Sequence, residues 1–534
     1  MTFNNRLAWL IPLAWLTLVI GIIPGLIVTT EWNRALLFAS NLLSAVSFCF
    51  SVLLVLNARP QAINLLLAGL VAGVFLSAAD GWYEIKGGGL ENTLEYAEEN
   101  AQVIGQSVDP RLRSRLEQGR ASGTFFYPNS YAAHLILTLP LCLAALWRWG
   151  RHVHPPGLSR ALFIAFAVIS GGLPLLWSGS RAALIALGGG LFFAMLFMKQ
   201  LPKYWRIGLA VMVMVTAFGG LFVVNKGRTL SSLGARFYYW TGAADMTAAN
   251  PGTGVGIGEF YPEYCQRLGN SPLTIAGLEI ERFFPGFMQT LDFSDKLTRE
   301  PHNFWLLFSS ESGLLGALAA TILLSMPFWF QRLRKGRNMK NNTGNDRQFF
   351  IVAGRAGLAA WLLHGLTDMN MHVPGTVIVA AALPLLALFA ADSEAISTAS
   401  DNPPPKKYVK AGLILLGVLT LFGGWRLPGD LAMRNLGHAT ASDTLHTSEL
   451  QSMTMKTARL LPFSPNPWLL LADRAESNGH LKIARRACRE ALARTPHRGF
   501  IWARLAVLEQ RLGDTEAAAR AMTKADHWGA WQSP

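Results

Sequence analysis

The sequence has few charged residues for its length. Asp, Glu, Lys and Arg make up only 15% of its 534 residues, while 51% are hydrophobic, and a typical soluble protein has about 25% charged residues. A soluble protein is therefore excluded for the chain as a whole. The hydrophobic residues gather in repeated apolar runs, and about 20 such residues in a helix cross the hydrocarbon of a bilayer. The sequence thus predicts an all-α, polytopic membrane protein.

Metal-binding patterns are also scarce. The chain has four cysteines, and they form neither a CxxC nor a Cys/His metal spacing. No Asp-x-Asp occurs, and the loop after the first apolar run offers only Glu31 as a carboxylate. Because a hard divalent cation prefers a shell of several oxygen ligands, we expect no metal and no other cofactor. Whether Cys265 and Cys488 form a disulfide is left open at this point.

The positive charge indicates how the chain is threaded through the membrane. The net charge is +14, but the basic clusters lie in short loops between apolar runs, as the positive-inside rule describes, and we therefore expect no nucleic-acid partner. The basic loops fall on one face when the spans alternate from a cytoplasmic N-terminus. We predict eleven spans, at about 8–29, 35–56, 62–79, 128–147, 161–178, 182–198, 207–224, 304–330, 348–366, 374–391 and 409–426.

This threading divides the chain into two predicted domains. Residues 1–426 form the transmembrane domain, whose main extracytoplasmic loops are 80–127 and 225–303. Because the number of spans is odd, residues 427–534 are expected on the same extracytoplasmic side. Within them Trp468 recurs as Trp502 and Gly479 as Gly513, an offset of 34 residues in both cases. That period is typical of tetratricopeptide repeats, which stack pairs of antiparallel helices, so the tail is predicted to be a helical domain of this kind.

Four short motifs follow one another at the membrane–loop junctions. They are Gly123-Thr124-Phe125-Phe126-Tyr127-Pro128-Asn129, then Ser178-Gly179-Ser180-Arg181, then Arg236 with the glycine-rich stretch 250–260, and finally His302-Asn303-Phe304 with Glu311-Ser312-Gly313. In this order they resemble the O-antigen ligase and O-antigen polymerase superfamily of bacterial envelope glycan transferases, over about residues 30–390. The glycines of 252–258 lack the strand and the Lys-Ser/Thr of a phosphate-binding loop, and we expect a flexible turn there.

The resemblance implies a metal-independent, inverting membrane glycosyltransferase of the type-C kind. Such an enzyme moves a glycan from an undecaprenyl pyrophosphate donor to a hydroxyl acceptor at the periplasmic face of the bacterial inner membrane. By motif match, Arg181, Arg236 and His302 are the expected catalytic residues, and Asn129 and Asn303 join the two arginines in binding substrate. The residue types suit this chemistry, because guanidinium groups bind phosphate oxygens with a planar fork and an imidazole can accept the proton of a hydroxyl.

Each candidate also has a structural explanation. Arg181 could anchor a helix end among lipid headgroups, Arg236 could help to fold its loop, and a histidine at a membrane edge is often structural. His364 and Asp368 have helical i, i+4 spacing and could pair toward the same cavity.

The acceptor is left open by the sequence. Lipid A core, a growing polysaccharide and a protein side chain are all compatible with the same donor chemistry, so a ligase, a polymerase and a protein O-oligosaccharyltransferase stay possible. A non-enzymatic transporter of lipid-linked sugars is the alternative from another class, although the candidate residues gather at one face and not at the bilayer midplane. The repeat tail, which could hold a polysaccharide or an envelope assembly protein, favours a polymerase.

Overall fold

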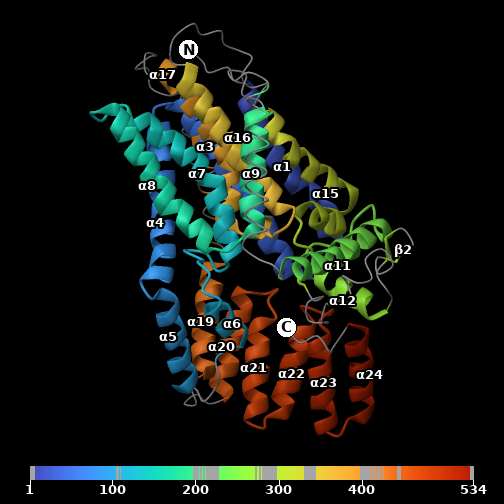
Figure 1. The fold of residues 1–534 in the computed structure, drawn as a ribbon. Helices are drawn as coiled ribbons and strands as arrows, with labels where there is room; N and C mark the ends of the chain where they lie inside the picture. Colours follow the sequence, from blue (N-terminus) through green and yellow to red (C-terminus); the bar gives the residue numbers. More distant parts are fainter. Residues whose placement is uncertain are drawn as a thin grey trace. The chain divides into compact units, whose positions relative to one another are not determined.

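The computed structural model describes residues 6–103, 110–196, 228–270, 298–329, 344–396, 426–441 and 447–528, together with short stretches between them. The described chain is helical apart from two antiparallel strands of two residues each, β1 (Thr274–Ile275) and β2 (Leu278–Glu279) (Figure 1). The predicted all-α class is therefore confirmed at the level of fold class.

Seven stretches of the described chain are helical, long and apolar enough to cross a membrane, and each coincides with a predicted span: Leu10–Val28, Trp32–Ala58, Ala62–Lys86, Pro128–Gly150, Pro156–Trp177, Phe304–Trp329 and Pro374–Asp392. The protein is thus a multi-pass membrane protein. Two further predicted spans, 182–198 and 348–366, correspond to the helices α9 (Arg181–Leu196) and α16 (Gly344–Gly365). The predicted spans 207–224 and 409–426 lie mostly outside the described residues, so the number eleven stays a prediction.

The chain forms two compact units, of which the first contains Met1–Leu18, Asn41–Gly227 and Ala320–Leu419. Its helices, besides α9 and α16, are η1 (Arg6–Trp9), most of α1 (Leu10–Gly21), most of α3 (Trp32–Ala58), α4 (Ala62–Lys86), α5 (Gly89–Val103), α6 (Pro110–Glu117), α7 (Pro128–Gly150), α8 (Pro156–Trp177), the last part of α15 (Phe304–Trp329), η3 (Asn370–His372) and α17 (Pro374–Ile396).

Helix α7 lies at the centre of this first unit and packs against α4, α8, α9, α16 and α17. It begins at Pro128, a residue whose fixed φ suits the first helical position. Small residues bring its neighbours close. A Cβ atom on Gly357 of α16 would collide with the carbonyl oxygen of Leu137, and one on Gly190 of α9 would collide with that of Ala356. Glycine at these helix contacts lets the backbones approach as they do in membrane bundles.

The second unit contains Val19–Ser40, Arg228–Ala319 and Thr420–Pro534. Its helices are α2 (Ile23–Val28), α11 (Arg228–Ala249), α12 (Phe260–Asn270), the first part of α15 (Phe304–Trp329), and six helices near the C-terminus: α19 (Leu427–Ala441), α20 (Thr447–Leu460), α21 (Asn466–Ser477), α22 (Leu481–Leu492), α23 (Gly499–Arg511) and α24 (Thr515–His527).

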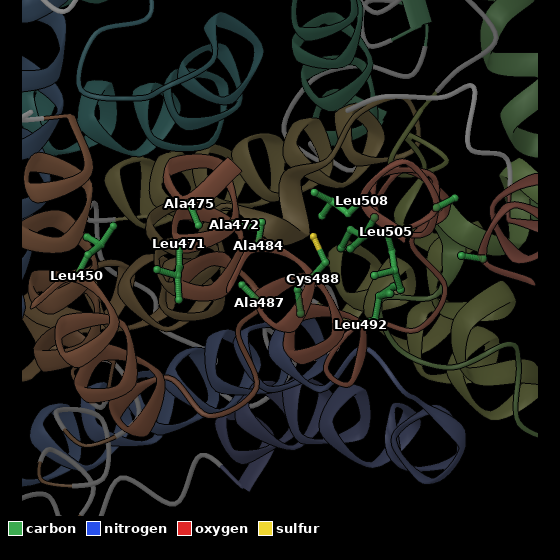
Figure 2. Packing of buried hydrophobic residues seen from close by; sticks show 14 of the residues in the cluster. Leu450, Leu471, Ala472, Ala475, Ala484, Ala487, Cys488, Leu492, Leu505 and Leu508 are labelled. Carbon is green, nitrogen blue, oxygen red and sulfur yellow. The ribbon is translucent and has the colours of Figure 1, made fainter. Parts of the chain in front are cut away.

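The six C-terminal helices pack against one another in chain order, drawn in orange and red in Figure 1. The turns after α21 and α23 each contain a glycine with a left-handed backbone, Gly479 (φ 76°) and Gly513 (φ 84°), at the predicted 34-residue offset. Figure 2 shows the shared core, in which Leu471, Cys488 and Leu505 pack together with small alanines. This is the arrangement expected of stacked helical repeats, and the tetratricopeptide assignment itself stays a prediction.

The glycine-rich stretch after α11 differs from the flexible turn expected from the sequence. Its backbone is hydrogen bonded to α15, from Val255 N–H to the Ser310 carbonyl (2.8 Å) and from Gly256 N–H to the Glu311 carbonyl (3.2 Å). Helix α15 is interrupted at Gly313 (φ 69°, ψ −157°), where a Cβ atom would lie 2.5 Å from the Pro251 carbonyl oxygen. The loop is therefore a docked element, and its glycines permit a close approach of two backbones.

Candidate functional site

Arg181 is the first residue of α9, directly after the tight turn that joins α8 to α9. The turn has a simple local cause. Ser178 closes α8, its N–H bonding the Pro174 carbonyl at 2.9 Å, and Gly179 follows with φ 62°, the left-handed geometry that often ends a helix. Ser180 then accepts the first bond of α9, from Leu184 N–H (3.2 Å). The side chain of Arg181 is half-buried.

Arg120 lies against this turn, although sequence reasoning did not select it. Its Nε donates to the Ser178 carbonyl at 2.7 Å, and its Nη2 donates to Asn129 Oδ1 at 2.9 Å. Gly179 makes room for it, because a Cβ atom there would lie 3.1 Å from Arg120 Nε. Burial lowers the pKa of Arg120, Asp368 opposes this shift, and the positive charge of Arg181 lowers the pKa further. The charges of Arg120 and Arg181 thus repel each other.

Asn129 connects Arg120 to an acidic residue. While its Oδ1 accepts from Arg120, its Nδ2 donates to Asp368 Oδ2 at 2.6 Å. The other oxygen of Asp368, Oδ1, accepts from Met369 N–H at 2.7 Å. The predicted substrate-binding residue Asn129 is therefore placed beside Arg181's turn, where it also orients a second arginine.

His364 lies near the same turn. Its Nδ1 is 2.8 Å from Asn370 Oδ1, and its Nε2 is 3.5 Å from Ser180 Oγ. The amide of Asn370 is fixed in turn, because its Nδ2 donates to the Trp361 carbonyl at 2.8 Å. Helix α16 ends at Gly365, so Asp368 lies beyond it and its i, i+4 spacing from His364 is not helical. Both residues nevertheless lie near the Ser178–Arg181 turn, through the contacts of His364 with Ser180 and of Asp368 with Asn129.

Arg236, His302 and Asn303 belong to the second unit, whereas Arg181 belongs to the first. Arg236 lies in α11, and Tyr239, three residues later on the same face of the helix, has its ring 5.8 Å from the imidazole of His302. Tyr239 therefore connects α11, the helix that contains Arg236, to His302, the predicted base. Both Arg236 and His302 are half-buried.

The backbone of His302 is unusual. Its φ is 50°, and it is the one non-glycine residue with positive φ among the described residues. A left-handed conformation costs a non-glycine residue on the order of 1–3 kcal/mol and persists only where the surroundings impose it. The next residue contributes to that constraint, because Asn303 caps α15 by accepting from Leu306 N–H with its Oδ1 at 3.1 Å. Asn303 thus has a capping contact besides its predicted role in substrate binding.

Glu259, at the end of the docked loop, is a second residue that sequence reasoning missed. Its Oε1 accepts from Thr30 N–H (2.7 Å), Thr30 Oγ1 (2.6 Å) and Glu31 N–H (2.9 Å), and its Oε2 is 3.0 Å from His497 Nδ1 in the tail. Burial by itself raises the pKa of Glu259, but the bonds from His497 and Thr30 outweigh it and leave the pKa below its ordinary value. The four glycines before Glu259 were the available signal, yet nothing in the sequence indicated its partners.

The cysteines are all free and buried, which answers the question left open for Cys265 and Cys488. Burial raises the pKa of Cys265 to about 12 and that of Cys488 to about 11, so both are protonated and unreactive at neutral pH. Within the described ranges, no three His, Cys, Asp or Glu side chains gather into a group that could hold a metal ion. Metal independence itself stays a prediction.

The two neighbourhoods, around Arg181 and around His302, lie in one multi-pass helical membrane protein. Residues 166–321 match the model of a family described as O-Antigen ligase. The matched segment runs from within α8 to within α15 and includes Arg181, Arg236, His302 and Asn303. It supports a place in the O-antigen ligase family, as the sequence motifs predict. Comparison with curated proteins found no match.

Proposed function

We propose that this protein is a glycosyltransferase of the O-antigen ligase and polymerase type. It takes a glycan from an undecaprenyl pyrophosphate donor and transfers it to a hydroxyl acceptor at the periplasmic face of the bacterial inner membrane. The observation that carries the proposal is the position of the family match, since residues 166–321 enclose Arg181, Arg236 and His302, the three residues that the sequence motifs select.

The proposed reaction is one direct displacement. The acceptor oxygen attacks the anomeric carbon, the bond from that carbon to the pyrophosphate oxygen breaks, and the acceptor proton passes to the imidazole of His302. The pyrophosphate leaves with its new negative charge, which Arg181 and Arg236 stabilise through charge-assisted hydrogen bonds. Attack opposite the leaving group inverts the configuration at the anomeric carbon. This chain's residues supply all the roles, and no metal takes part.

The local geometry of His302 supports its role as the base. Its strained backbone conformation (φ 50°) is of the kind that gathers at functional sites, and the Asn303 cap of α15 fixes the chain directly after it. Its ring lies beside Tyr239 of α11, the helix that also carries Arg236. A base held in one orientation is what proton transfer in a transition state requires.

A transfer assay tests the proposal. The purified full-length protein is given an undecaprenyl-pyrophosphate-linked glycan and hydroxyl acceptors of the three classes, and product is measured with and without EDTA. His302→Gln keeps a hydrogen-bonding side chain but cannot take up a proton at neutral pH, so transfer should fall by about 10²–10⁴. The exposed His480, in the turn after α21, provides the control, and His480→Gln should transfer normally.

Three results would contradict the proposal. Wild-type turnover by His302→Gln would remove the base. Complete loss of activity in EDTA, restored by Mg²⁺ or Mn²⁺, would remove the metal-free mechanism. Absence of transfer to all three acceptor classes, together with movement of the lipid-linked glycan across vesicle membranes, would favour the transporter.

The C-terminal helices bear on the choice of acceptor. Six consecutive helices stacked in chain order give an elongated surface, and such surfaces bind extended ligands. We therefore favour a growing polysaccharide as the acceptor, bound on this tail in the periplasm, over lipid A core or a protein side chain. An envelope assembly protein is the other ligand that such a surface suits.

A further inference from the structure

Arg120 lies where the segment before α7 meets the α8–α9 turn, and it belongs to none of the motifs that carry the family resemblance. Its guanidinium donates two hydrogen bonds, from Nε to the Ser178 carbonyl (2.7 Å) and from Nη2 to Asn129 Oδ1 (2.9 Å). Two bonds to separate elements define the plane of the group. Arg120 is therefore held in place, whereas an arginine that merely solvates a surface loop would be mobile.

The surroundings of Arg120 contain charges of both signs. The charged groups that act most on it are Asp368, which is attractive, and Arg181, which is repulsive. The repulsion between the two guanidinium groups acts in a partly desolvated place, where it is stronger than in water. A bound anion that contacts both guanidinium groups would offset this repulsion.

A chain of hydrogen bonds fixes Arg120 in this position. Asp368 is anchored by Met369 N–H (2.7 Å), Asp368 accepts from Asn129 (2.6 Å), and Asn129 accepts from Arg120. Because Asn129 separates the carboxylate from the guanidinium in this chain, Asp368 orients Arg120 through an amide. Gly179, with its left-handed backbone and no Cβ, lets Arg120 reach the turn from which Arg181 projects.

We propose that Arg120 and Arg181 together bind the pyrophosphate of the donor lipid, and that Asn129 and Asp368 are the positioning residues for Arg120. The proposal rests on the proposed function, because it takes its ligand from the donor. It adds a residue outside the matched segment 166–321 and gives Asn129 a definite task. Two adjacent forks suit the two phosphoryl groups of a pyrophosphate, while a monophosphate can engage only one of them fully.

The test compares two lipids and one free anion on the purified full-length protein. Affinities are measured for undecaprenyl pyrophosphate, undecaprenyl phosphate and inorganic pyrophosphate. Wild-type protein should prefer the pyrophosphate lipid over the monophosphate lipid. Arg120→Ala should weaken binding of the pyrophosphate lipid by about ten- to a hundredfold, the range for a charged hydrogen-bonding group, and should remove most of the preference. Inorganic pyrophosphate should follow the same trend, because it shares the anionic group.

Variants of the supporting residues separate positioning from general stability. Arg120→Lys keeps the charge but not the fork, and it should lower the pyrophosphate-to-monophosphate ratio and raise the KM for the donor more than it lowers kcat. Asn129→Asp, which cannot donate to Asp368, should have a similar effect. The control is Arg113→Ala in the nearby α6, where Arg113 pairs with Glu98 at 2.7 Å and is 47% exposed, and it should keep the wild-type ratio.

The outcomes are distinguishable. A wild-type protein with equal affinity for the two lipids would overturn the proposed donor and with it the function. A wild-type protein that prefers the pyrophosphate lipid, together with an unchanged ratio in Arg120→Ala, would overturn the role of Arg120 alone. If Arg120→Ala does not fold, Arg120→Lys decides in the same way, because an unchanged ratio in that variant contradicts a forked contact.

Discussion

At the scale of single residues, the backbone conformation of His302 points to a functional site, in addition to the chemistry of its side chain. The residue has φ 50° and is followed at once by the Asn303 cap of α15. A non-glycine residue in this conformation carries strain, and strained residues gather at functional sites because the surroundings hold them in a required orientation. His302 should therefore decrease stability while it supports activity.

Two substitutions test this separation. His302→Gly should be more stable than His302→Ala by about 1 kcal/mol, because glycine adopts positive φ without a Cβ clash, and both should lack glycan transfer. Thermal unfolding of the purified variants measures the difference. The matched control is His438, inside α19, where the order should reverse and alanine should be the more stable by about 1 kcal/mol. The same order at both positions would contradict strain at His302.

At the scale of elements, the docked loop 250–260 connects the start of α3 to the C-terminal helices. Glu259 accepts from Thr30 and Glu31 on one side and lies 3.0 Å from His497 on the other. His497 is also stacked on Trp528, with 4.1 Å between the rings. Burial lowers the pKa of His497, but its hydrogen bond to Glu259 and the charges of Glu259, Glu263 and Glu31 raise it above its ordinary value of 6.5.

The docking of the tail on this loop should depend on pH. The raised pKa of His497 means that its contribution is complete below pH 6.5 and is lost as the pH rises through its folded value. The lowered pKa of Glu259 means that its contribution is complete above pH 4.5 and is lost as the pH falls through its folded value. Hydrogen-exchange protection of residues 250–260 should therefore be greatest between these two limits.

Replacing either partner checks the assignment. His497→Gln should flatten the decrease in protection above pH 6.5, because glutamine carries no charge that is lost there. Glu259→Gln should flatten the decrease at both limits, because it removes the carboxylate on which the raised pKa of His497 also depends. His480→Gln, at an exposed turn of the same tail, should keep the wild-type profile. A wild-type profile in His497→Gln would assign the pH dependence above pH 6.5 to another group.

The contacts of these elements show which features of the structure could be predicted from the sequence and which could not. The apolar runs predict the helices, because about 20 apolar residues have few other stable states in a bilayer, and the motifs select Arg181, Arg236 and His302. Neither the apolar runs nor the motifs predict contacts between segments that are far apart in the sequence. Glu259 and His497 are separated by 238 residues, and Arg120 needs the fold to meet Ser178. The break of α15 at Gly313 is likewise set by the loop that docks there, and helical periodicity does not reveal it.

At the scale of the whole molecule, the predicted topology determines whether the candidate residues and the tail can work on the same substrate. Basic loops around 148–160, 199–206, 332–347 and 406–410 place the tail outside the cytoplasm if the chain has eleven spans. The two predicted spans 207–224 and 409–426, which lie largely outside the described residues, decide the parity. With ten spans the tail would be cytoplasmic and could not bind a periplasmic glycan.

Reporter fusions test this topology in intact cells. Alkaline phosphatase, which is active only outside the cytoplasm, should be active when fused after Pro534 and inactive when fused after Lys340, because the basic loop 331–347 is predicted to be cytoplasmic. A fusion in the loop 80–127, after Glu117, provides the positive control on the opposite face. The decisive comparison is between a fusion after Ile396, the last residue of α17, and one after Pro534. Opposite activities require one crossing between α17 and the tail, so that the span 409–426 exists and His497 reaches Glu259 on the periplasmic side. Equal activities would remove that span and, with it, the tail's proposed role in binding the polysaccharide.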